Sequence, residues 1–281
     1  MMRKIGIIGF GNMGSAIAER IKAEDAKIWV FDKDKDKIKG LSGVNTSENC
    51  IDLVKNVDVV ILAVKPQDFE FALEDIKSGI KGKLVISIAA GITTGYIEKK
   101  LEGAGEARVI RVMPNMPARI GKGMTCLSKG RFASDGDLGF AEELFVKLGA
   151  TLILNEDKMN AATAISGSGP GYCYDLIESQ HVNIHNDAEL KKFELDFSKL
   201  LEKAAAGIGF NVNESIMLAN ATTSGSIALI KESGVPVGEL KKQITSKGGT
   251  TEAALAALHK GDTLENAAKA ALKRAKELSR E

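Results

Sequence analysis

The chain has 281 residues, of which 38 are basic and 37 are acidic, and its formal net charge is +1. This balance does not produce the basic surface that binds nucleic acid or an anionic membrane. Hydrophobic residues make up 44% of the chain, which excludes low-complexity disorder, and the length suits one large or two ordinary domains. The cysteines are odd in number and far apart, which argues against a disulfide framework and a zinc site.

No apolar run reaches the roughly 18 residues that a membrane-spanning helix needs. The apolar stretch after Lys4 is too short for a signal peptide. We therefore expect a cytoplasmic protein with no metal and with neither nucleic acid nor membrane as a partner. The chain has 29 glycines but only 5 prolines, which indicates many close backbone approaches inside regular structure.

The first half of the chain predicts strands that alternate with helices. Helix-compatible polar segments lie between the strand patterns, as at 15–22, 67–78 and 93–101. Continuous apolar strands between helices are typical of a parallel sheet that is covered on both faces. The predicted strands are 4–8, 26–31, 57–64, 84–88, 109–112, 124–127 and 151–154.

Strand patterns stop after about residue 155, where Ala, Leu, Lys and Glu become frequent and helices are predicted. We therefore predict an α/β fold in which a Rossmann-like dinucleotide-binding domain over residues 1–155 is followed by an all-helical domain over residues 156–281. Small residues in the second domain suit close helix packing, either between subunits or within one. The clearest predicted helices there are 199–206, 216–230, 252–258 and 264–278.

A glycine-rich loop follows the first predicted strand and opens the first helix. Gly9-Phe10-Gly11-Asn12-Met13-Gly14 is a GxGxxG pattern in the context that dinucleotide binding requires. Gly9 permits the tight turn, Gly11 lets a pyrophosphate approach the backbone, and Gly14 lets helix and strand pack closely. The phosphates would lie at the helix N-terminus, where free N–H groups favour anions. An ordinary glycine turn is the alternative.

The second predicted strand ends at Asp32, about 20 residues beyond this loop, where an acid accepts hydrogen bonds from the ribose of NAD. Lys33, Lys35 and Lys37 alternate with acids directly afterwards, and lysines can receive the 2′-phosphate of NADP. A solvated helix start is the simpler interpretation for most of these charges. We expect Asp32 and Lys33 to contact the cofactor, and the choice between NADPH and NADH stays open.

Four further segments are hard to explain by packing alone. Val59–Gln67 ends a strand in Lys-Pro, and Arg111–Gly123 holds two prolines and an Asn in a strand-exit loop. Ser166–Tyr172 (SGSGPGY) and Thr245–Thr251 (TSKGGTT) are turns rich in glycine and hydroxyls, each before a helix. Together with the N-terminal loop, these segments resemble the signature set of pyrroline-5-carboxylate reductase over nearly the whole chain.

The resemblance implies an N-terminal dinucleotide-binding domain and a C-terminal helical dimerisation domain. Members of this family assemble as homodimers, often as a ring of dimers. The implied reaction transfers hydride from NADPH or NADH to the C=N bond of a small-molecule substrate, 1-pyrroline-5-carboxylate, and gives L-proline in the last step of proline biosynthesis.

The resemblance also implies site residues. Thr251 matches the position where the family has a hydroxyl near the imine nitrogen, and we expect it to be catalytic. The expected substrate contacts are Ser246, Gly248, Gly249, Thr250 and Thr251. The expected cofactor contacts, including those argued above, are Gly9, Gly11, Asn12, Met13, Gly14, Asp32, Lys33, Ala63, Val64, Lys65, Pro66, Ala90 and Asn115.

The chemistry of the Thr245–Thr251 turn supports this assignment. Its glycines expose N–H groups, its hydroxyls add donors, and a helix N-terminus stabilises an anion by roughly 0.3–1 kcal/mol. A capping turn uses the same N–H groups, so the two roles are compatible. An iminium already carries its proton, and Thr251 would therefore orient the nitrogen or relay a proton rather than act as a strong base.

Two of the expected contacts have alternatives. Lys65 could protonate a carbonyl oxygen, but Pro66 fixes an extended backbone at Lys65, which favours a contact with the cofactor. Asn115 could donate either to backbone or to the nicotinamide carboxamide. The competing functions are a related imine or β-hydroxyacid reductase and a non-catalytic NAD(P)-binding regulator, and the TSKGGTT turn favours imine reduction.

Several positions depart from the family pattern. Met116 and Lys247 replace the usual Thr and Pro, and Gly171 replaces the usual Ala of GSGPAY. Cys50 stands where the family has an Asn beside the cofactor, and a one-residue shift could bring Asn49 into that place.

The stretch 180–197 is extra relative to the family, and we expect a surface excursion or an altered oligomer contact there. Its His181, His185 and Asp187 are too weakly spaced to predict a metal site.

Overall fold

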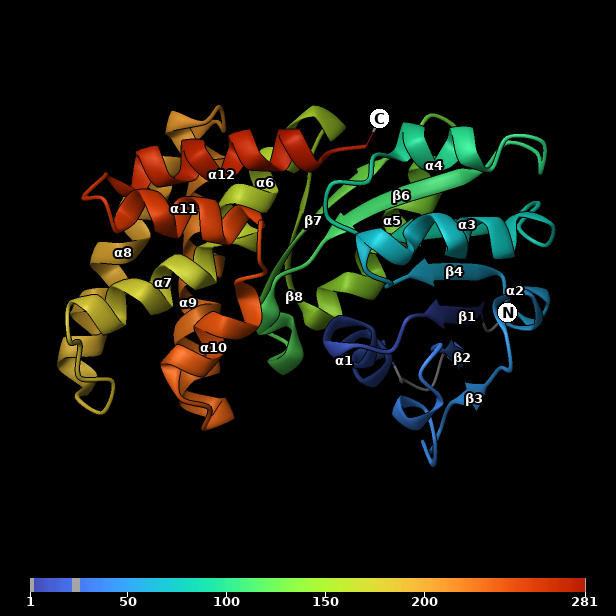
Figure 1. The fold of residues 1–281 in the computed structure, drawn as a ribbon, viewed down its shortest axis with the longest axis horizontal. Coiled ribbons are helices and arrows are strands. Elements are labelled where there is room, and N and C mark those ends of the chain that lie inside the picture. The colour runs from blue at the N-terminus through green and yellow to red at the C-terminus, as the bar shows by residue number, and fades with distance from the viewer. Residues whose placement is uncertain (1–2, 22–25, 281) are drawn as a thin grey trace. The chain divides into compact units, whose positions relative to one another are not determined.

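The computed structural model describes residues 3–21 and 26–280. The chain folds into two compact units (Figure 1). The chain passes between them after Glu156, next to the boundary expected at residue 155, and also at three other places. The N-terminal unit comprises Met1–Met113, Leu127–Glu156 and Arg280–Glu281, and the helical unit comprises Pro114–Cys126 and Asp157–Ser279.

An eight-stranded sheet runs through the N-terminal unit in the order β3-β2-β1-β4-β5-β6-β7-β8. β1 pairs in parallel with β2 and β4, so that Ile5 lies opposite Ile28 and Val59. This order is that of a doubly wound Rossmann sheet, which confirms the predicted fold class. The strands are β1 (Arg3–Ile8), β2 (Ala26–Phe31), β3 (Asn45–Thr46), β4 (Val59–Leu62), β5 (Leu84–Ser87), β6 (Arg108–Met113), β7 (Gly123–Lys129) and β8 (Gly149–Ile153).

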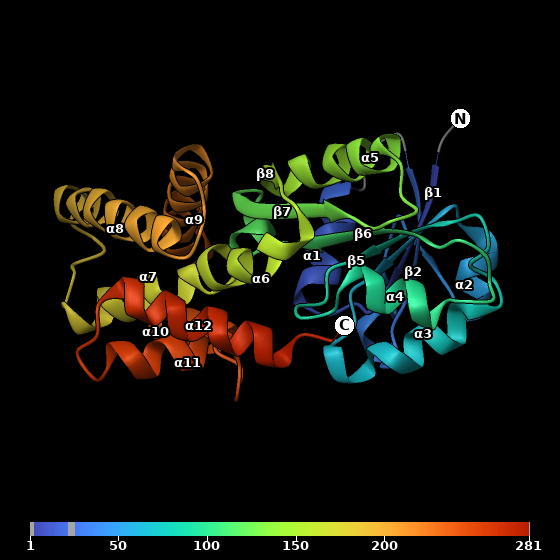
Figure 2. The same ribbon diagram turned by 90° about the horizontal axis from the view of Figure 1, so that it is seen from above.

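Helices cover both faces of this sheet, as predicted. α3 and α4 lie on one face and α5 on the other (Figure 2). β4 and β5 are buried along their whole length, because a strand covered on both sides exposes neither row of side chains. The helices of this unit are α1 (Asn12–Ile21), α2 (Cys50–Asn56), α3 (Phe69–Lys77), α4 (Thr94–Lys100) and α5 (Asp135–Phe145).

From Asp157 to Ser279 the described elements are helical. α8 packs against α9, and α11 packs against α12 (Figure 1). None of the helices in the described ranges combines the length and hydropathy of a membrane span. The helices are α6 (Met159–Ala162), α7 (Gly169–Ser179), α8 (Asp187–Gly207), α9 (Val212–Ser233), α10 (Val237–Ile244), α11 (Thr250–Leu258) and α12 (Leu264–Leu278).

Of the two alternatives expected for 180–197, a surface excursion is wrong for the second half, which is the beginning of α8, and an altered oligomer contact stays a prediction. Asn186 caps this helix by accepting hydrogen bonds from the N–H groups of Ala188 and Glu189. Phe193 and Phe197 stack at a ring-centroid distance of 5.8 Å and are buried with Leu190. Their spacing of three and four residues places them on one helix face, and this face belongs to the core.

Candidate active site

The glycine-rich loop lies where β1 ends and α1 begins. Gly9 has a φ of +98°, and a Cβ there would lie 2.7 Å from the backbone carbonyl of Ala63. A Cβ at Gly14 would collide with the carbonyl oxygen of Gly9. A Cβ at Gly11, by contrast, would meet no atom within 4 Å. The loop is therefore tight at its outer glycines and open at the middle one, where an anion can approach the N-terminus of α1.

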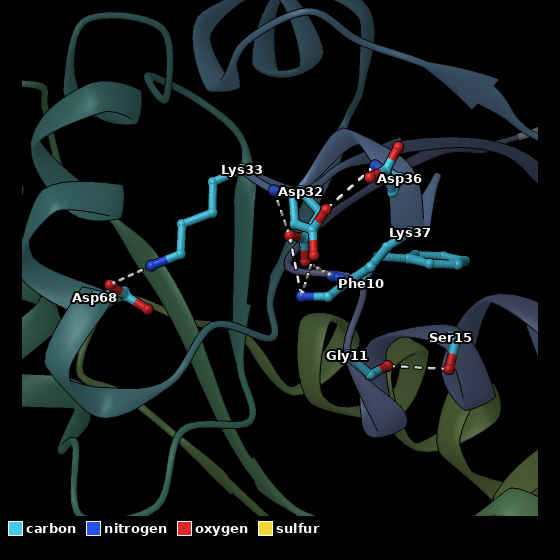
Figure 3. Close-up of polar contacts among 9 residues, drawn as sticks. Phe10, Gly11, Ser15, Asp32, Lys33, Asp36, Lys37 and Asp68 are labelled. Atoms are coloured by element: carbon cyan, nitrogen blue, oxygen red, sulfur yellow. Dashed lines mark hydrogen bonds and ion pairs between the residues drawn. The ribbon is translucent and has the colours of Figure 1, made fainter. Parts of the chain in front are cut away.

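Asp32 follows β2, and only 7% of its surface is exposed. Its Oδ2 accepts a hydrogen bond from the N–H of Phe10 at 2.6 Å (Figure 3), and its Oδ1 accepts one from the N–H of Asp34 at 2.9 Å. The ammonium of Lys37 lies 3.3 Å from the same Oδ1. Burial alone raises the pKa of Asp32, but these N–H groups and Lys37 together hold it below its ordinary value. The ionised carboxylate thus ties the glycine-rich loop to the end of β2.

Two lysines beside Asp32 form ion pairs. The Nζ of Lys33 lies 2.8 Å from Oδ1 of Asp68, and this hydrogen bond raises the pKa of Lys33 (Figure 3). Lys37 pairs with Asp32 and, at 3.8 Å, with Asp34. An exposed pair such as that of Lys33 with Asp68 contributes about 0–1 kcal/mol, so Lys33 can exchange its acid for a phosphate at little cost, whereas Lys37 is paired with the buried Asp32.

A cleft of about 690 Å³ lies beside the glycine-rich loop, and a volume of this size suits a cofactor. The strand order reverses between β1 and β4, and ligands of open α/β sheets bind at the carboxyl ends of strands at such a point. Phe71, which is 75% exposed, and Cys50 also line the cleft. The expected cofactor contacts along its wall are Gly9, Gly11, Asp32, Lys33, Ala63, Val64 and Lys65.

The other expected cofactor contacts of this unit lie in three short segments. Asn12, Met13 and Gly14 form the first turn of α1. Pro66 opens a short 3₁₀ helix whose N-cap is Lys65, and Ala90 is exposed in the turn after β5. Their contacts with a cofactor stay predictions.

Cys50, and not Asn49, lines the cleft, so the one-residue shift considered from the sequence is wrong. Asn49 is the N-cap of α2, since its Oδ1 accepts from the N–H of Asp52 at 2.9 Å. Burial raises the pKa of the Cys50 thiol to about 12, and nearby Asp75 adds to the shift. The cleft therefore presents a neutral thiol where the family has an amide.

The Ser246–Thr251 turn joins α10 to α11 in the helical unit. Gly248 has a φ of +71°, its N–H donates to Oε2 of Glu252 at 2.7 Å, and its carbonyl accepts from Nε of Arg274 at 2.8 Å. Thr250 and Thr251 are the first residues of α11. Because the first N–H groups of a helix have no intrahelical acceptors, this turn carries a partial positive charge that suits a carboxylate.

Three hydroxyls meet where α11 begins. Oγ1 of Thr251 donates to Oγ of Ser168 at 3.1 Å, and Oγ of Ser168 lies 2.9 Å from Oγ1 of Thr250. Ser168 and Thr251 are both buried. Each hydroxyl can both donate and accept a hydrogen bond, so the cluster can form a further hydrogen bond with a small polar ligand. Ser168 is absent from the expected contacts, although its SGSGP motif offered a signal.

Asn115 is buried in the Pro114–Cys126 segment of the helical unit. Its Nδ2 donates to the carbonyl of Ser166 at 3.1 Å, and its Oδ1 accepts from the N–H of Met124 at 2.8 Å. Both polar atoms thus bind backbone, which is one of the two alternatives considered for this residue. A contact of Asn115 with the nicotinamide stays a prediction.

Comparison with known proteins identifies the family. Residues 4–91 match the profile described as NADP oxidoreductase coenzyme F420-dependent, and residues 194–281 match the profile described as pyrroline-5-carboxylate reductase dimerisation. A pyrroline-5-carboxylate reductase of Arabidopsis thaliana is 33% identical over 98% of this chain and 95% of its own length. The chain belongs to the pyrroline-5-carboxylate reductase family.

Two solved structures of the family are similar to this chain over nearly its whole length. A pyrroline-5-carboxylate reductase of Coxiella burnetii has a TM-score of 0.67 and 31% identity, with 100% of each chain covered. A pyrroline carboxylate reductase of Plasmodium falciparum, solved with NADP bound, has a TM-score of 0.64 and 30% identity, with 99% of this chain and 98% of that chain covered.

One departure from the pyrroline-5-carboxylate reductase pattern contacts the expected catalytic residue. Gly171 lies in the first turn of α7, where the family usually has Ala. A Cβ on Gly171 would lie only 2.5 Å from Cγ2 of Thr251. The missing methyl group therefore makes room for Thr251 in this member of the family.

Proposed function

We propose that this chain reduces the C=N bond of 1-pyrroline-5-carboxylate with hydride from NADPH or NADH and releases L-proline. Family membership supports the reaction class. The observation that carries the proposal is the hydroxyl cluster of Ser168, Thr250 and Thr251 at the N-terminus of α11. A cluster of neutral donors at a positive helix end suits a small substrate that carries one carboxylate and one C=N group.

The cleft of the N-terminal unit fits the cofactor. The open space at Gly11 admits a pyrophosphate to the N-terminus of α1, where N–H groups favour anions. Asp32, Lys33 and Lys37 offer a carboxylate and two cations to the adenosine ribose and its 2′-substituent. When bound, the reduced nicotinamide supplies the hydride.

The chain's own residues need little acid–base chemistry for this reaction. In the protonated substrate the imine nitrogen already carries a proton, so the new C–H bond forms while the C=N π electrons move to nitrogen, and a neutral amine results. Thr251 Oγ1 orients that nitrogen, and Ser168 holds Thr251 in place. The first-turn N–H groups of α11 hold the carboxylate. Positioning of reactants by such contacts can lower a barrier by about 7–11 kcal/mol.

Turnover with each cofactor tests the proposal. The purified chain is mixed with racemic 1-pyrroline-5-carboxylate, and the oxidation of NADPH and of NADH is followed separately by absorbance. We expect turnover with at least one of them, and the ratio of kcat/KM values gives the preference. No turnover with either cofactor refutes the proposed function.

Thr251 variants test the assigned role of the hydroxyl. We expect Thr251→Ala to lower kcat/KM at least about tenfold, which corresponds to about 1.4 kcal/mol of transition-state stabilisation. Thr251→Ser keeps the hydroxyl and is the matched control, with most of the activity retained. An unchanged kcat/KM in Thr251→Ala removes Thr251 from the mechanism.

We also propose that the chain acts in the cytoplasm as a homodimer, with a ring of dimers as the larger assembly. The dimerisation profile covers residues 194–281. α8 and α9 expose large apolar side chains, and clusters of such side chains mark association surfaces. Light scattering on a sizing column measures the mass, and a monomer at micromolar concentration contradicts the proposal. The exposed side chains are Leu195, Leu200, Val212, Ile216 and Met217.

A further inference from the structure

A buried carboxylate on α7 binds residues of two helices at once. Asp175 is 4% exposed, and its Oδ1 accepts a hydrogen bond from Nζ of Lys241 on α10 at 3.0 Å. The two oxygens of Asp175 also lie 3.0 and 3.1 Å from Nε2 of His259, which directly follows α11. Because an ionised carboxylate only accepts hydrogen bonds, the imidazole N–H is the donor in this contact.

The two partners of Asp175 stand on either side of the Ser246–Thr251 turn in the sequence. α10 carries Lys241 and ends at Ile244, directly before the turn. α11 begins inside the turn, at Thr250, and ends at the residue before His259. Asp175 on α7 therefore binds a residue of α10, which precedes the turn, and a residue at the end of α11, which follows it.

The same helix also contacts the turn itself. Gly171 and Asp175 are four residues apart in α7, so they lie on one face of the helix. Gly171 packs against Cγ2 of Thr251, and Ser168, just before α7, accepts a hydrogen bond from Thr251 Oγ1. The first turn of α7 thus touches Thr251, and the next turn fixes the helices that carry it.

We propose that Asp175 is a positioning residue for the reduction: by binding Lys241 and His259 together, it fixes the Ser246–Thr251 turn and so places Thr251. The proposal rests on the proposed function in one respect, namely that Thr251 contacts the substrate. The contact of Asp175 with Lys241 is an ion pair. Burial alone lowers the pKa of Lys241, but its pairing with Glu178 and Asp175 raises that pKa above its ordinary value, so the ammonium stays charged.

Hydrogen exchange in the free chain tests the link without any substrate. Asp175→Asn keeps the size of the side chain but leaves one acceptor oxygen where two were used. We expect the amides of residues 245–252 to exchange about tenfold faster than in the wild type, as follows from the loss of one hydrogen bond that opposes local opening. The amides of the glycine-rich loop should not change.

Glu178→Gln is the matched control for this experiment. It removes a carboxylate from the same helix, and the ion pair of Glu178 is to Lys241 on α10. We expect near wild-type exchange of residues 245–252 in this variant. Wild-type exchange in Asp175→Asn overturns the proposal, and so does equal acceleration in both variants, since that would make the effect a general one of charge near Lys241.

Kinetics distinguishes positioning from a purely structural role. We expect Asp175→Asn to lower kcat/KM for the imine substrate about tenfold while KM for the reduced cofactor stays unchanged. His259→Gln keeps a neutral N–H donor at a side chain that is 62% exposed, and it should show a smaller loss. The double variant should be no worse than Asp175→Asn, because the two residues act through one link.

The outcomes separate this proposal from the proposed function. Wild-type kcat/KM in both single variants overturns the positioning role. If the wild-type chain reduces no imine, the proposed function fails, and the exchange experiment still decides whether Asp175 fixes the turn. If Asp175→Asn does not fold, the exchange of residues 245–252 in His259→Ala, which removes the imidazole donor to Asp175, decides instead, and unchanged exchange there overturns the proposal.

Discussion

Replacing Gly171 by the alanine that is usual in the family should harm this member. A Cβ at this position would lie 2.5 Å from Cγ2 of Thr251, whereas ordinary contacts begin at 3.4 Å, so one group must move by 0.9 Å (3.4 minus 2.5). Thr251 is buried and β-branched, which leaves it few rotamers. Turning its side chain away breaks the hydrogen bond from Oγ1 to Ser168.

The magnitude follows from these contacts. The lost hydrogen bond costs about 0.5–1.5 kcal/mol, and overpacking costs about 1–3 kcal/mol. Alanine is about 1 kcal/mol better than glycine inside a helix, which offsets part of the loss in folding stability but none of the displacement of Thr251. We therefore expect Gly171→Ala to lower the free energy of unfolding by about 0.5–3.5 kcal/mol and to lower kcat/KM about tenfold.

The assay is the steady-state reduction of the imine at a saturating concentration of the reduced cofactor, beside a urea unfolding curve. Gly139→Ala on α5 is the matched control, because a Cβ there meets no atom within 4 Å. It should gain stability and keep its activity. Adding Thr251→Ser to Gly171→Ala removes Cγ2 and should restore activity. Wild-type kcat/KM in Gly171→Ala, or no recovery in the double variant, refutes the reasoning.

Three further predictions address the cofactor cleft. The pKa of Asp32 is lowered in the folded chain, so the ionised carboxylate stabilises the fold above the ordinary carboxyl pKa of about 4, and this stabilisation is lost as the pH falls through the lower folded value. Urea unfolding of Asp32→Asn should therefore show less acid destabilisation than urea unfolding of the wild type. Equal pH profiles of the free energy of unfolding contradict this. Lys33→Ala should raise KM for NADPH more than KM for NADH if Lys33 meets the 2′-phosphate, and equal changes exclude that contact. Gly14→Ala should destabilise folding by about 1–3 kcal/mol, because its Cβ collides with the carbonyl oxygen of Gly9. Gly11→Ala should keep the melting temperature but weaken cofactor binding. A Gly14→Ala variant with wild-type stability and normal cofactor binding contradicts the close packing of Gly14 against Gly9.

Strands could be predicted from the sequence where burial on both faces leaves a continuous apolar run. The prediction of 26–31 matches β2, and 84–88 differs from β5 by one residue. β3 was missed because its two residues, Asn45 and Thr46, carry no such pattern. α5 was missed although Ser134 and Asp137 form a capping box, a signal that lies in the sequence itself.

The candidate site shows where sequence reasoning ends. The glycine-rich loop and Asp32 belong to one local motif, and motif spacing was enough to bring them together. Ser168 and Thr251 are 83 residues apart, and Asp175 and His259 are 84 residues apart. Pairs at such separations meet only because α7, α10 and α11 pack in one particular way, and a single sequence read by itself carries no sign of that packing.

The residues after β2 show why the type of one side chain does not decide between NAD and NADP. An acid here favours NAD because its oxygens receive ribose hydroxyls, but Asp32 already accepts two backbone N–H groups and a lysine. A carboxylate has about four lone-pair sites, so room for one hydroxyl remains. A phosphate monoester carries about −1.5 to −2 charges near neutral pH, and it repels Asp32 unless nearby cations compensate. Lys37 already compensates Asp32, and Lys33 is held by Asp68 in an exposed pair that contributes little energy. The preference therefore depends on whether Lys33 exchanges Asp68 for the phosphate, which is a property of the ion pairs and not of the acid alone.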